Sequence, residues 1–217
     1  MEIATSSFPK TIFVTGIGTD VGKSYATGWL AKTMAQAGAN VITQKLIQTG
    51  NKDLSEDIDI HRRIMGIPLQ PRDLDHTTAP MILSYPASPH LAARIDNVEL
   101  DYSVADKATE KLLEEYDNVI IEGAGGLMVP LTEEMLTIDY IAERKLPTAI
   151  VVNGALGAIN HALLSLYTAA ARGIDIFAVI YNPYFDTDQW ISAENREYLR
   201  RYVAVNHPKA LFLEMDK

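Results

Sequence analysis

A glycine-rich segment near the N-terminus combines residue types that can hold a phosphate group. Residues 16–24 read Gly-Ile-Gly-Thr-Asp-Val-Gly-Lys-Ser, between a strand-like run and a segment of helical periodicity. Glycines let backbone N–H groups approach an anion, and the start of a helix supplies further free N–H donors. Lys23 can reach terminal phosphate oxygens, and the hydroxyl of Ser24 can bind Mg²⁺. The segment therefore predicts a nucleotide-phosphate site.

The spacing of these glycines is a variant of the known patterns. The pattern G-x-x-x-x-G-K-[ST] requires glycine at position 17, where the chain has Ile17. The dinucleotide pattern G-x-G-x-x-G also fails, because Val21 stands where glycine or alanine is required. Gly-Lys-Ser between a strand and a helix still favours a nucleotide-phosphate loop over an ordinary connection.

A second lysine can reach the same place. Lys45 lies near the end of the apolar run 41–47. The carboxyl ends of neighbouring parallel strands line one crevice, so Lys45 can point toward the same phosphates as Lys23. Two ammonium groups suit phosphoryl transfer, in which negative charge spreads over the equatorial oxygens. From position alone, however, a lysine that extends into solvent is the favoured interpretation.

Two acidic positions are candidates for binding the metal of a nucleotide. Glu122 ends the apolar run 119–121 and precedes Gly-Ala-Gly-Gly, which is the placement of a Walker B acid. Asp57 lies in an acidic cluster that also contains Asp59, and the cluster fits either a helix start or a solvated face. The residues alone favour Glu122 and leave Asp57 open.

Short β-branched runs alternate with helical segments along the chain, which predicts an α/β fold with a doubly wound, mostly parallel sheet and helices on both faces. The predicted helices cover 23–37 and 157–172, and each is followed by glycine. Residues 68–89 are expected to form loops, and 1–217 to form a single domain. The predicted strands cover residues 11–15, 41–47, 119–121, 148–152 and 176–180.

Composition excludes several classes of protein. The 217 residues are 47% hydrophobic, which can form a full core and argues against disorder. A net charge of −9 argues against general nucleic-acid binding, and no apolar run approaches the ~18 residues of a membrane span. Without cysteine there is no disulfide or thiolate metal site. Residues 1–10 lack the features of a secretory signal, so the expected location is the cytoplasm.

Over roughly residues 11–185 the sequence resembles the dethiobiotin synthetase family. The resemblance is most specific in Glu-Gly-Ala-Gly-Gly and Gly-Ala-Ile-Asn-His, because many ATPases share a glycine loop. It implies a homodimer that makes the ureido ring of dethiobiotin from 7,8-diaminopelargonate, CO₂ and MgATP. The motifs are Phe13–Gly16 with Val21–Ser24, Lys45 with Thr49 and Gly50, Ser88–His90, Ile121–Gly126 with Val129–Leu131, and Leu156–His161.

The resemblance also implies a reaction path and a set of site residues. An amine captures CO₂ as a carbamate, the carbamate attacks the γ-phosphate, and the second amine closes the ring with loss of phosphate. Lys23 and Lys45 would be catalytic, and Mg²⁺ would bind Ser24, Glu122 and Asp57, or Asp59 in place of Asp57. ATP would contact Gly18, Thr19, Asp20, Val21, Gly22, Lys23, Ser24, Tyr25 and, through the purine, Asn182. The diamine would contact Thr19, Lys45 and Thr49, and its carboxylate would bind Gly157, Ala158, Ile159 and Asn160 of the other subunit.

Some assignments stay open at this level. The implied chemistry requires neither His90 nor His161, which are interpreted as a structural residue and a helix residue near the dimer contact. Relatives often continue with a loop against the base where this chain ends at Lys217, which leaves the nucleotide preference open.

Two other classes of function compete with the ligase. A partition-type regulatory ATPase would be a nucleotide-switched dimer, but it usually has a lysine where this chain has Ile17. An amide-forming synthase would normally bring a glutamine-hydrolysing domain, for which 217 residues leave no room. The ring-closing ligase is the favoured prediction.

Overall fold

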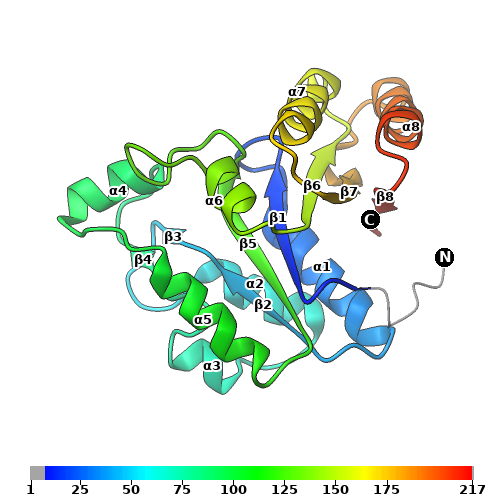
Figure 1. Cartoon of the computed structure of the whole chain (residues 1–217). Coiled ribbons are helices and arrows are strands. Elements are labelled where there is room, and N and C mark those ends of the chain that lie inside the picture. Colours follow the sequence, from blue (N-terminus) through cyan, green and yellow to red (C-terminus); the bar gives the residue numbers. More distant parts are fainter. Residues whose placement is uncertain (1–7, 217) are drawn as a thin grey trace.

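A six-stranded parallel sheet forms the centre of the computed structural model, which describes residues 8–216 (Figure 1). The spatial order of its strands is β2-β5-β1-β6-β7-β8, and every neighbouring pair is parallel. Residues 1–7 and 217 lie outside the described residues. They belong to the predicted single domain, and residues 1–7 are most of the segment in which the sequence shows no secretory signal. The strands are β1 (Thr11–Gly16), β2 (Val41–Lys45), β5 (Asn118–Gly126), β6 (Thr148–Asn153), β7 (Ile176–Asn182) and β8 (Leu211–Glu214).

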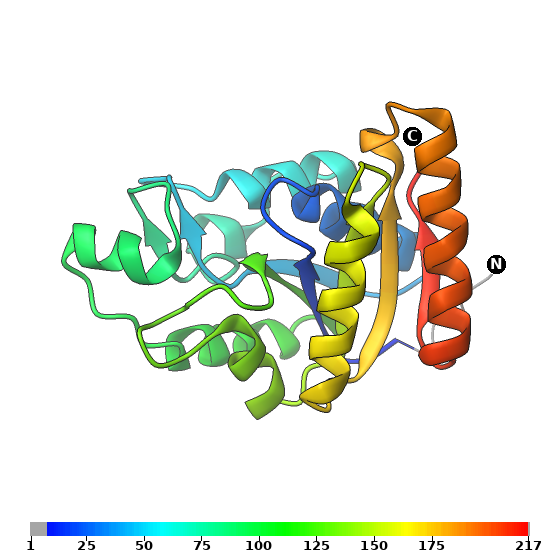
Figure 2. The same cartoon turned by 90° about the horizontal axis from the view of Figure 1, so that it is seen from above.

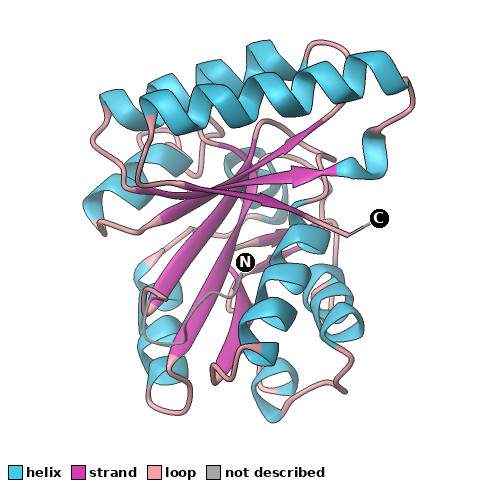
Figure 3. Ribbon diagram, turned by 90° about the vertical axis from the view of Figure 1, so that its right-hand side faces the viewer, coloured by secondary structure: helices cyan, strands magenta, loops and turns pink. Residues whose placement is uncertain are grey.

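Helices cover both faces of this sheet, as the sequence predicts (Figure 3). In β1, Phe13 packs into the core on one face while Ile12 and Val14 pack into the core on the other. A strand buried on both faces reads as a continuous apolar run, which is why β1 was recognisable. One face carries α5 (Ser103–Leu113), α6 (Thr137–Glu143), α7 (Ala158–Ala171) and α8 (Gln189–Asn206), and the other carries α1 (Lys23–Gln36).

Three of the predicted segments differ from the structure by more than two residues. The run 119–121 belongs to the longer strand β5, which continues through Glu122 to Gly126. The run 41–47 is not one strand: β2 ends at Lys45, and β3 (Gln48–Thr49) pairs with β4 (Ile82–Leu83) in a separate two-stranded sheet. The predicted loops at 68–89 contain β4 and the short helix α3 (Pro71–Leu74), and α4 (Pro89–Asp96) begins at their end. These elements are too short for a periodic pattern, and contacts from distant segments define them, such as the hydrogen bond from Gln48 N to Met81 O.

The acidic cluster around Asp57 forms the start of a helix, α2 (Glu56–Met65). Ser55 caps this helix, because its hydroxyl accepts a hydrogen bond from Ile58 N. Acidic side chains in the first turn also favour the positive end of the helix dipole. Helix α2 packs directly on α1 at Gly28, where a Cβ atom would lie 3.1 Å from the Cα of His61. Glycine at this crossing allows α2 to approach the ends of β2 and β5.

Helices α7 and α8 are the longest on their face and lie side by side (Figure 2). Between residues 8 and 216, no helix has the length and hydropathy required to cross a membrane.

Candidate active site

The glycine-rich loop connects β1 to α1 at the carboxyl edge of the sheet. Gly22 is the residue before α1 and has a φ of 88°, and a Cβ atom there would collide with the amide of Asn182. Only glycine meets both requirements, so the loop can curl over the start of the helix. Lys23 is buried, and its Nζ donates a hydrogen bond to the carbonyl of Gly18 at 2.9 Å. Burial holds the pKa of Lys23 below its usual value.

A cavity of about 700 Å³ opens beside this loop. Segments from across the chain line it, including the phosphate loop, the ends of β2 and β5, helix α2 and the residues after β7 and β8. Gly18 and Val21 belong to the loop but are not among the lining residues. The predicted site residues that line the cavity are Thr19, Asp20, Gly22, Lys23, Ser24, Tyr25, Lys45, Thr49, Asp57, Glu122 and Asn182.

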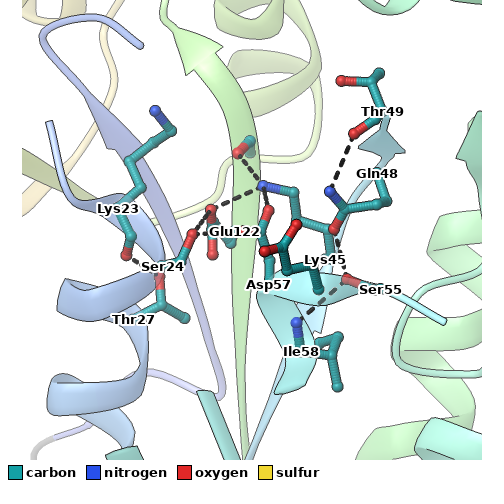
Figure 4. A network of polar contacts seen from close by, with 12 residues as sticks. Lys23, Ser24, Thr27, Lys45, Gln48, Thr49, Ser55, Asp57, Ile58 and Glu122 are labelled. Carbon is teal, nitrogen blue, oxygen red and sulfur yellow. Dashed lines mark hydrogen bonds and ion pairs between the residues drawn. The ribbon is translucent and has the colours of Figure 1, made fainter. Parts of the chain in front are cut away.

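Lys45 lies between two carboxylates at the wall of this cavity (Figure 4). Its Nζ is 2.5 Å from Asp57 Oδ2 and 2.7 Å from Glu122 Oε1, and it also donates to the carbonyl of Gly123 at 3.2 Å. The three N–H donors of the ammonium therefore have three acceptors. The structure thus excludes the interpretation of Lys45 as a lysine that extends into solvent.

Burial and charge act in opposite directions on the pKa values of this group. Burial alone would lower the pKa of Lys45, but the charges of Glu122 and Asp57 outweigh it and raise that pKa. Burial alone would raise the pKa of Glu122, but the charge of Lys45 and the hydrogen bond from His61 hold it well below its usual range. Both side chains therefore carry their charges at neutral pH.

Ser24 joins the same cluster from the first turn of α1. Its Oγ is 2.8 Å from Asp57 Oδ1 and 3.0 Å from Glu122 Oε1. A hydroxyl and two carboxylates are hard oxygen donors, which fit Mg²⁺. In residues 8–216, no group of three or more His, Cys, Asp or Glu side chains is placed to hold a metal by itself. The donor set fits a Mg²⁺ that shares its coordination with nucleotide phosphates and water.

The side chains of Asp57 and Asp59 point in different directions. Asp57 faces Ser24 and Lys45, whereas Asp59 is exposed and pairs with Arg63 on the same helix at 3.0 Å. Two residues correspond to about 200° of rotation around a helix, so the two carboxylates cannot face the same cavity.

Sequence reasoning missed His61, which lies four residues after Asp57 on the same face of α2. Its Nε2 is 2.6 Å from Glu122 Oε2 and its Nδ1 is 3.0 Å from Thr43 Oγ1. The helical spacing of Asp57 and His61 was a signal available in the sequence. Gln48 was also missed: its side chain accepts from Ser55 Oγ at 2.6 Å and donates to Thr49 O at 3.2 Å, which ties β3 to the start of α2.

The far end of the cavity is lined by aromatic and C-terminal residues. Asn182 ends β7, and its amide donates to Val21 O at 3.1 Å and accepts from Tyr184 N at 3.0 Å. Tyr184 and Phe185 lie in a short 3₁₀ helix, Pro183–Phe185, beside Met215. The residues after β8 therefore line the cavity, although the chain ends two residues after Met215.

Four predicted residues lie elsewhere. Gly157, Ala158, Ile159 and Asn160 form the start of α7, and none of them lines the cavity. His90 in α4 and His161 in α7 do not line it either. One chain therefore brings the predicted nucleotide and metal residues together but not the predicted carboxylate site.

Comparisons with known proteins identify relatives of this chain. A family model described as an AAA domain matches residues 10–207. The chain is 47% identical over 207 residues to the ATP-dependent dethiobiotin synthetase BioD 2 of Pasteurella multocida, covering 95% of this chain and 97% of that protein. It is 46% identical over 197 residues to the ATP-dependent dethiobiotin synthetase BioD of Chlorobaculum tepidum, covering 89% and 82%.

A solved structure, that of pNOB8 ParA bound to nonspecific DNA, has the same fold. It superposes with a TM-score of 0.53 at 14% identity and covers 96% of this chain and 87% of that one, which is a likeness of fold alone. The chain thus shares the α/β architecture of that structure. The two synthetases named above align with this chain over 97% and 82% of their own length. The chain therefore belongs to the ATP-dependent dethiobiotin synthetase family.

Proposed function

We propose that this protein is an ATP-dependent ligase that forms the ureido ring of dethiobiotin from 7,8-diaminopelargonate, CO₂ and ATP. One observation carries the proposal: Lys45 is held between Asp57 and Glu122 in the cavity that the phosphate loop also lines. A second cation beside Lys23 suits a reaction in which a carbamate is phosphorylated. The alternative of a partition-type regulatory ATPase is not favoured, because the relatives at 46–47% identity are named as synthetases.

The reaction has three steps. One amine of the diamine attacks CO₂ and loses a proton to give a carbamate. A carbamate oxygen then attacks the γ-phosphorus of ATP, and ADP leaves. The second amine attacks the carbon of the resulting mixed anhydride and loses a proton, the C–O bond to phosphate breaks, and phosphate leaves as the ring closes.

The two lysines stabilise negative charge in the second step. Lys23 exchanges the carbonyl of Gly18 for a phosphate oxygen, and Lys45 exchanges one of its three acceptors for an oxygen of the carbamate or the transferring group. Such donors act strongly because the site is buried and already oriented. Mg²⁺ bound by Ser24, Asp57 and Glu122 would neutralise charge on the β- and γ-phosphates. Thr19 and Thr49 line the cavity where the diamine would bind.

We assign the purine of ATP to the end of the cavity beside Asn182. Tyr184 and Phe185 supply aromatic surface there, and one N–H of the Asn182 amide is left beyond its bond to Val21. Aromatic faces stack on bases, which supports this placement.

We further propose a homodimer in which the start of α7 from one subunit binds the diamine carboxylate in the other. Free N–H groups at a helix start favour a carboxylate. Support comes from an apolar surface on and beside α7, where Leu156, Leu164 and Tyr167 are 85%, 58% and 72% exposed. We also propose a cytoplasmic location, which the ATP dependence of the relatives at 46–47% identity supports.

The decisive experiment measures ATP turnover with and without 7,8-diaminopelargonate and bicarbonate, together with the mass of the product. Phosphate release should require both substrates, and the product should have the mass of dethiobiotin. ATP turnover at the same rate with and without the diamine would instead indicate a regulatory ATPase.

A further inference from the structure

The two oxygens of Glu122 have different partners. Oε1 faces the cavity cluster, 2.7 Å from Lys45 Nζ and 3.0 Å from Ser24 Oγ. Oε2 points the other way, 2.6 Å from His61 Nε2. His61 is completely buried and does not line the cavity. Its contact with the site therefore runs through Glu122 alone.

The hydrogen bonds on the two sides of His61 indicate which ring nitrogen donates to Glu122. Arg62 donates from Nη1 to Thr43 Oγ1 at 2.8 Å, and a guanidinium has no acceptor. The hydroxyl hydrogen of Thr43 is then available for His61 Nδ1 at 3.0 Å. At the other end, the carboxylate of Glu122 pairs through Oε1 with the ammonium of Lys45 at 2.7 Å, and a carboxylate can only accept. The proton of the imidazole therefore belongs on Nε2, where it donates to Glu122.

Arg62, the first donor in this series of hydrogen bonds, is held in the protein interior. Arg62 is 1% exposed, and its Nε and Nη2 donate to the two oxygens of Asp73 at 2.8 and 2.7 Å. Its Nη2 also lies 3.3 Å from the carbonyl of Thr43. This paired geometry leaves the guanidinium one orientation, and hydrogen bonds transmit it to Glu122.

We propose that His61 is a positioning residue: its Nε2–H holds Glu122 so that Oε1 faces Ser24 and the metal of the bound nucleotide. The role of Glu122 in metal binding rests on the proposed function. Side chains that hydrogen-bond a metal-binding carboxylate orient it, and their loss commonly lowers metal affinity ~10–100-fold. Without this donor, Glu122 is free to turn toward other partners, and the oxygens that meet Mg²⁺ lose their alignment.

A pair of variants matched in shape separates the hydrogen bond from packing. His61→Gln keeps an N–H that can reach Glu122, whereas His61→Met has similar length and no donor. The measurement is calorimetric titration of ATP with and without Mg²⁺. We expect His61→Met to reduce the gain in ATP affinity from Mg²⁺ by ~10-fold or more. ATP affinity without Mg²⁺ should be unchanged, and His61→Gln should restore most of the gain.

Ile58→Ala is the control for packing of α2, because Ile58 is buried one turn earlier on the same helix and its side chain has no polar group. Ile58→Ala should lower the stability of the protein and leave the gain in ATP affinity from Mg²⁺ unchanged. A Mg²⁺ gain in His61→Met equal to that of the unmodified protein would overturn the inference. An equal loss in His61→Gln and His61→Met, or the same loss in Ile58→Ala, would also overturn it.

A second measurement is made on the unmodified protein, so its result does not depend on how a variant folds. In ¹⁵N-histidine NMR of the unmodified protein, with His61→Gln used for assignment, Nε2 of His61 should carry a proton in the absence of metal and nucleotide. An Nε2 without a proton would overturn the inference whatever the activity. An unmodified enzyme with no gain from Mg²⁺ would instead contradict the proposed function, so the two failures are distinguishable.

Discussion

Lys45 and Glu122 are register partners on the neighbouring parallel strands β2 and β5, and their side chains meet at 2.7 Å. Lys45 is the last residue of β2 and Glu122 lies in the middle of β5, so the pairing of the two strands sets the position of the ion pair. Asp57 joins it from α2 at 2.5 Å. The fold thereby places a cation and two carboxylates together at the wall of one cavity.

Replacing Lys45 tests its role in stabilising transferred charge. Lys45→Ala should slow turnover by at least ~10²-fold and leave ATP affinity largely intact, because the lost interaction acts mainly in the transition state. Steady-state kinetics and calorimetric titration of ATP measure the two effects. Lys52→Ala, at an exposed position, is the control and should behave as the unmodified enzyme. Near-normal turnover in Lys45→Ala would remove Lys45 from the mechanism.

Replacing Glu122 tests its role toward Mg²⁺. Glu122→Gln should move the Mg²⁺ titration of activity to higher concentration by ~10-fold or more, because a neutral amide is a poorer ligand than a carboxylate. Half-saturating Mg²⁺ at fixed ATP is the quantity to compare. A titration that coincides with that of the unmodified enzyme would reject Glu122 as a ligand.

A matched pair distinguishes the two aspartates of α2. Asp57→Asn should raise the Mg²⁺ requirement, because Asp57 faces Ser24 and Lys45. Asp59→Asn should leave it unchanged, since Asp59 is exposed and pairs only with Arg63 among the ion pairs of the described residues. Both variants lose the same charge from the same helix. An effect in Asp59→Asn and none in Asp57→Asn would reverse the assignment.

The buried pair of Arg62 and Asp73 should make stability depend on acid pH. Burial alone would raise the pKa of Asp73, but the hydrogen bonds and charge of Arg62 hold it below its usual range. The stabilisation is therefore fully present above the unfolded pKa of about 4 and is lost as pH falls through the lower folded pKa. Asp73→Asn should lower the free energy of unfolding at pH 7 by about 3–5 kcal/mol, because Arg62 stays buried without its partner.

Urea unfolding at pH 7 and below pH 4 measures this effect. The difference between the unmodified protein and Asp73→Asn should shrink in acid. Glu197→Gln, in an exposed pair with Arg201 on α8, should change stability little at either pH. A difference for Asp73→Asn that is independent of pH would contradict the charge assigned to Asp73.

Charges on α7 test the proposed dimer. Leu164→Glu combined with Tyr167→Glu should give a monomer. The KM for the diamine should rise about 10-fold or more, because the carboxylate of the diamine loses a hydrogen bond from the other subunit, and a bond to a charged group is worth that much. ATP affinity should not change. Sedimentation and steady-state kinetics are the measurements, and Val205→Glu, at a 77% exposed position on α8, is the control. A stable dimer with unchanged KM would place the interface elsewhere.

The sequence alone determined the parts of this protein that depend on contiguous residues. The phosphate loop was recognisable because glycines, Lys23 and Ser24 follow one another between a strand and a helix, and neighbouring residues decide such a turn. The central strands were recognisable because burial on both faces requires uninterrupted apolar runs. Glu122 could be placed because it directly follows one of these runs.

Only the tertiary structure decided which distant side chains meet. Lys45 and Glu122 are 77 residues apart, and only the pairing of β2 with β5 brings the lysine out of solvent. The direction of α2 is set by its close packing at Gly28 and by the pair of Arg62 with Asp73. That direction turns Asp57 inward, Asp59 outward and His61 onto Glu122. Local sequence can predict a helix, but its rotation about its own axis depends on everything packed against it.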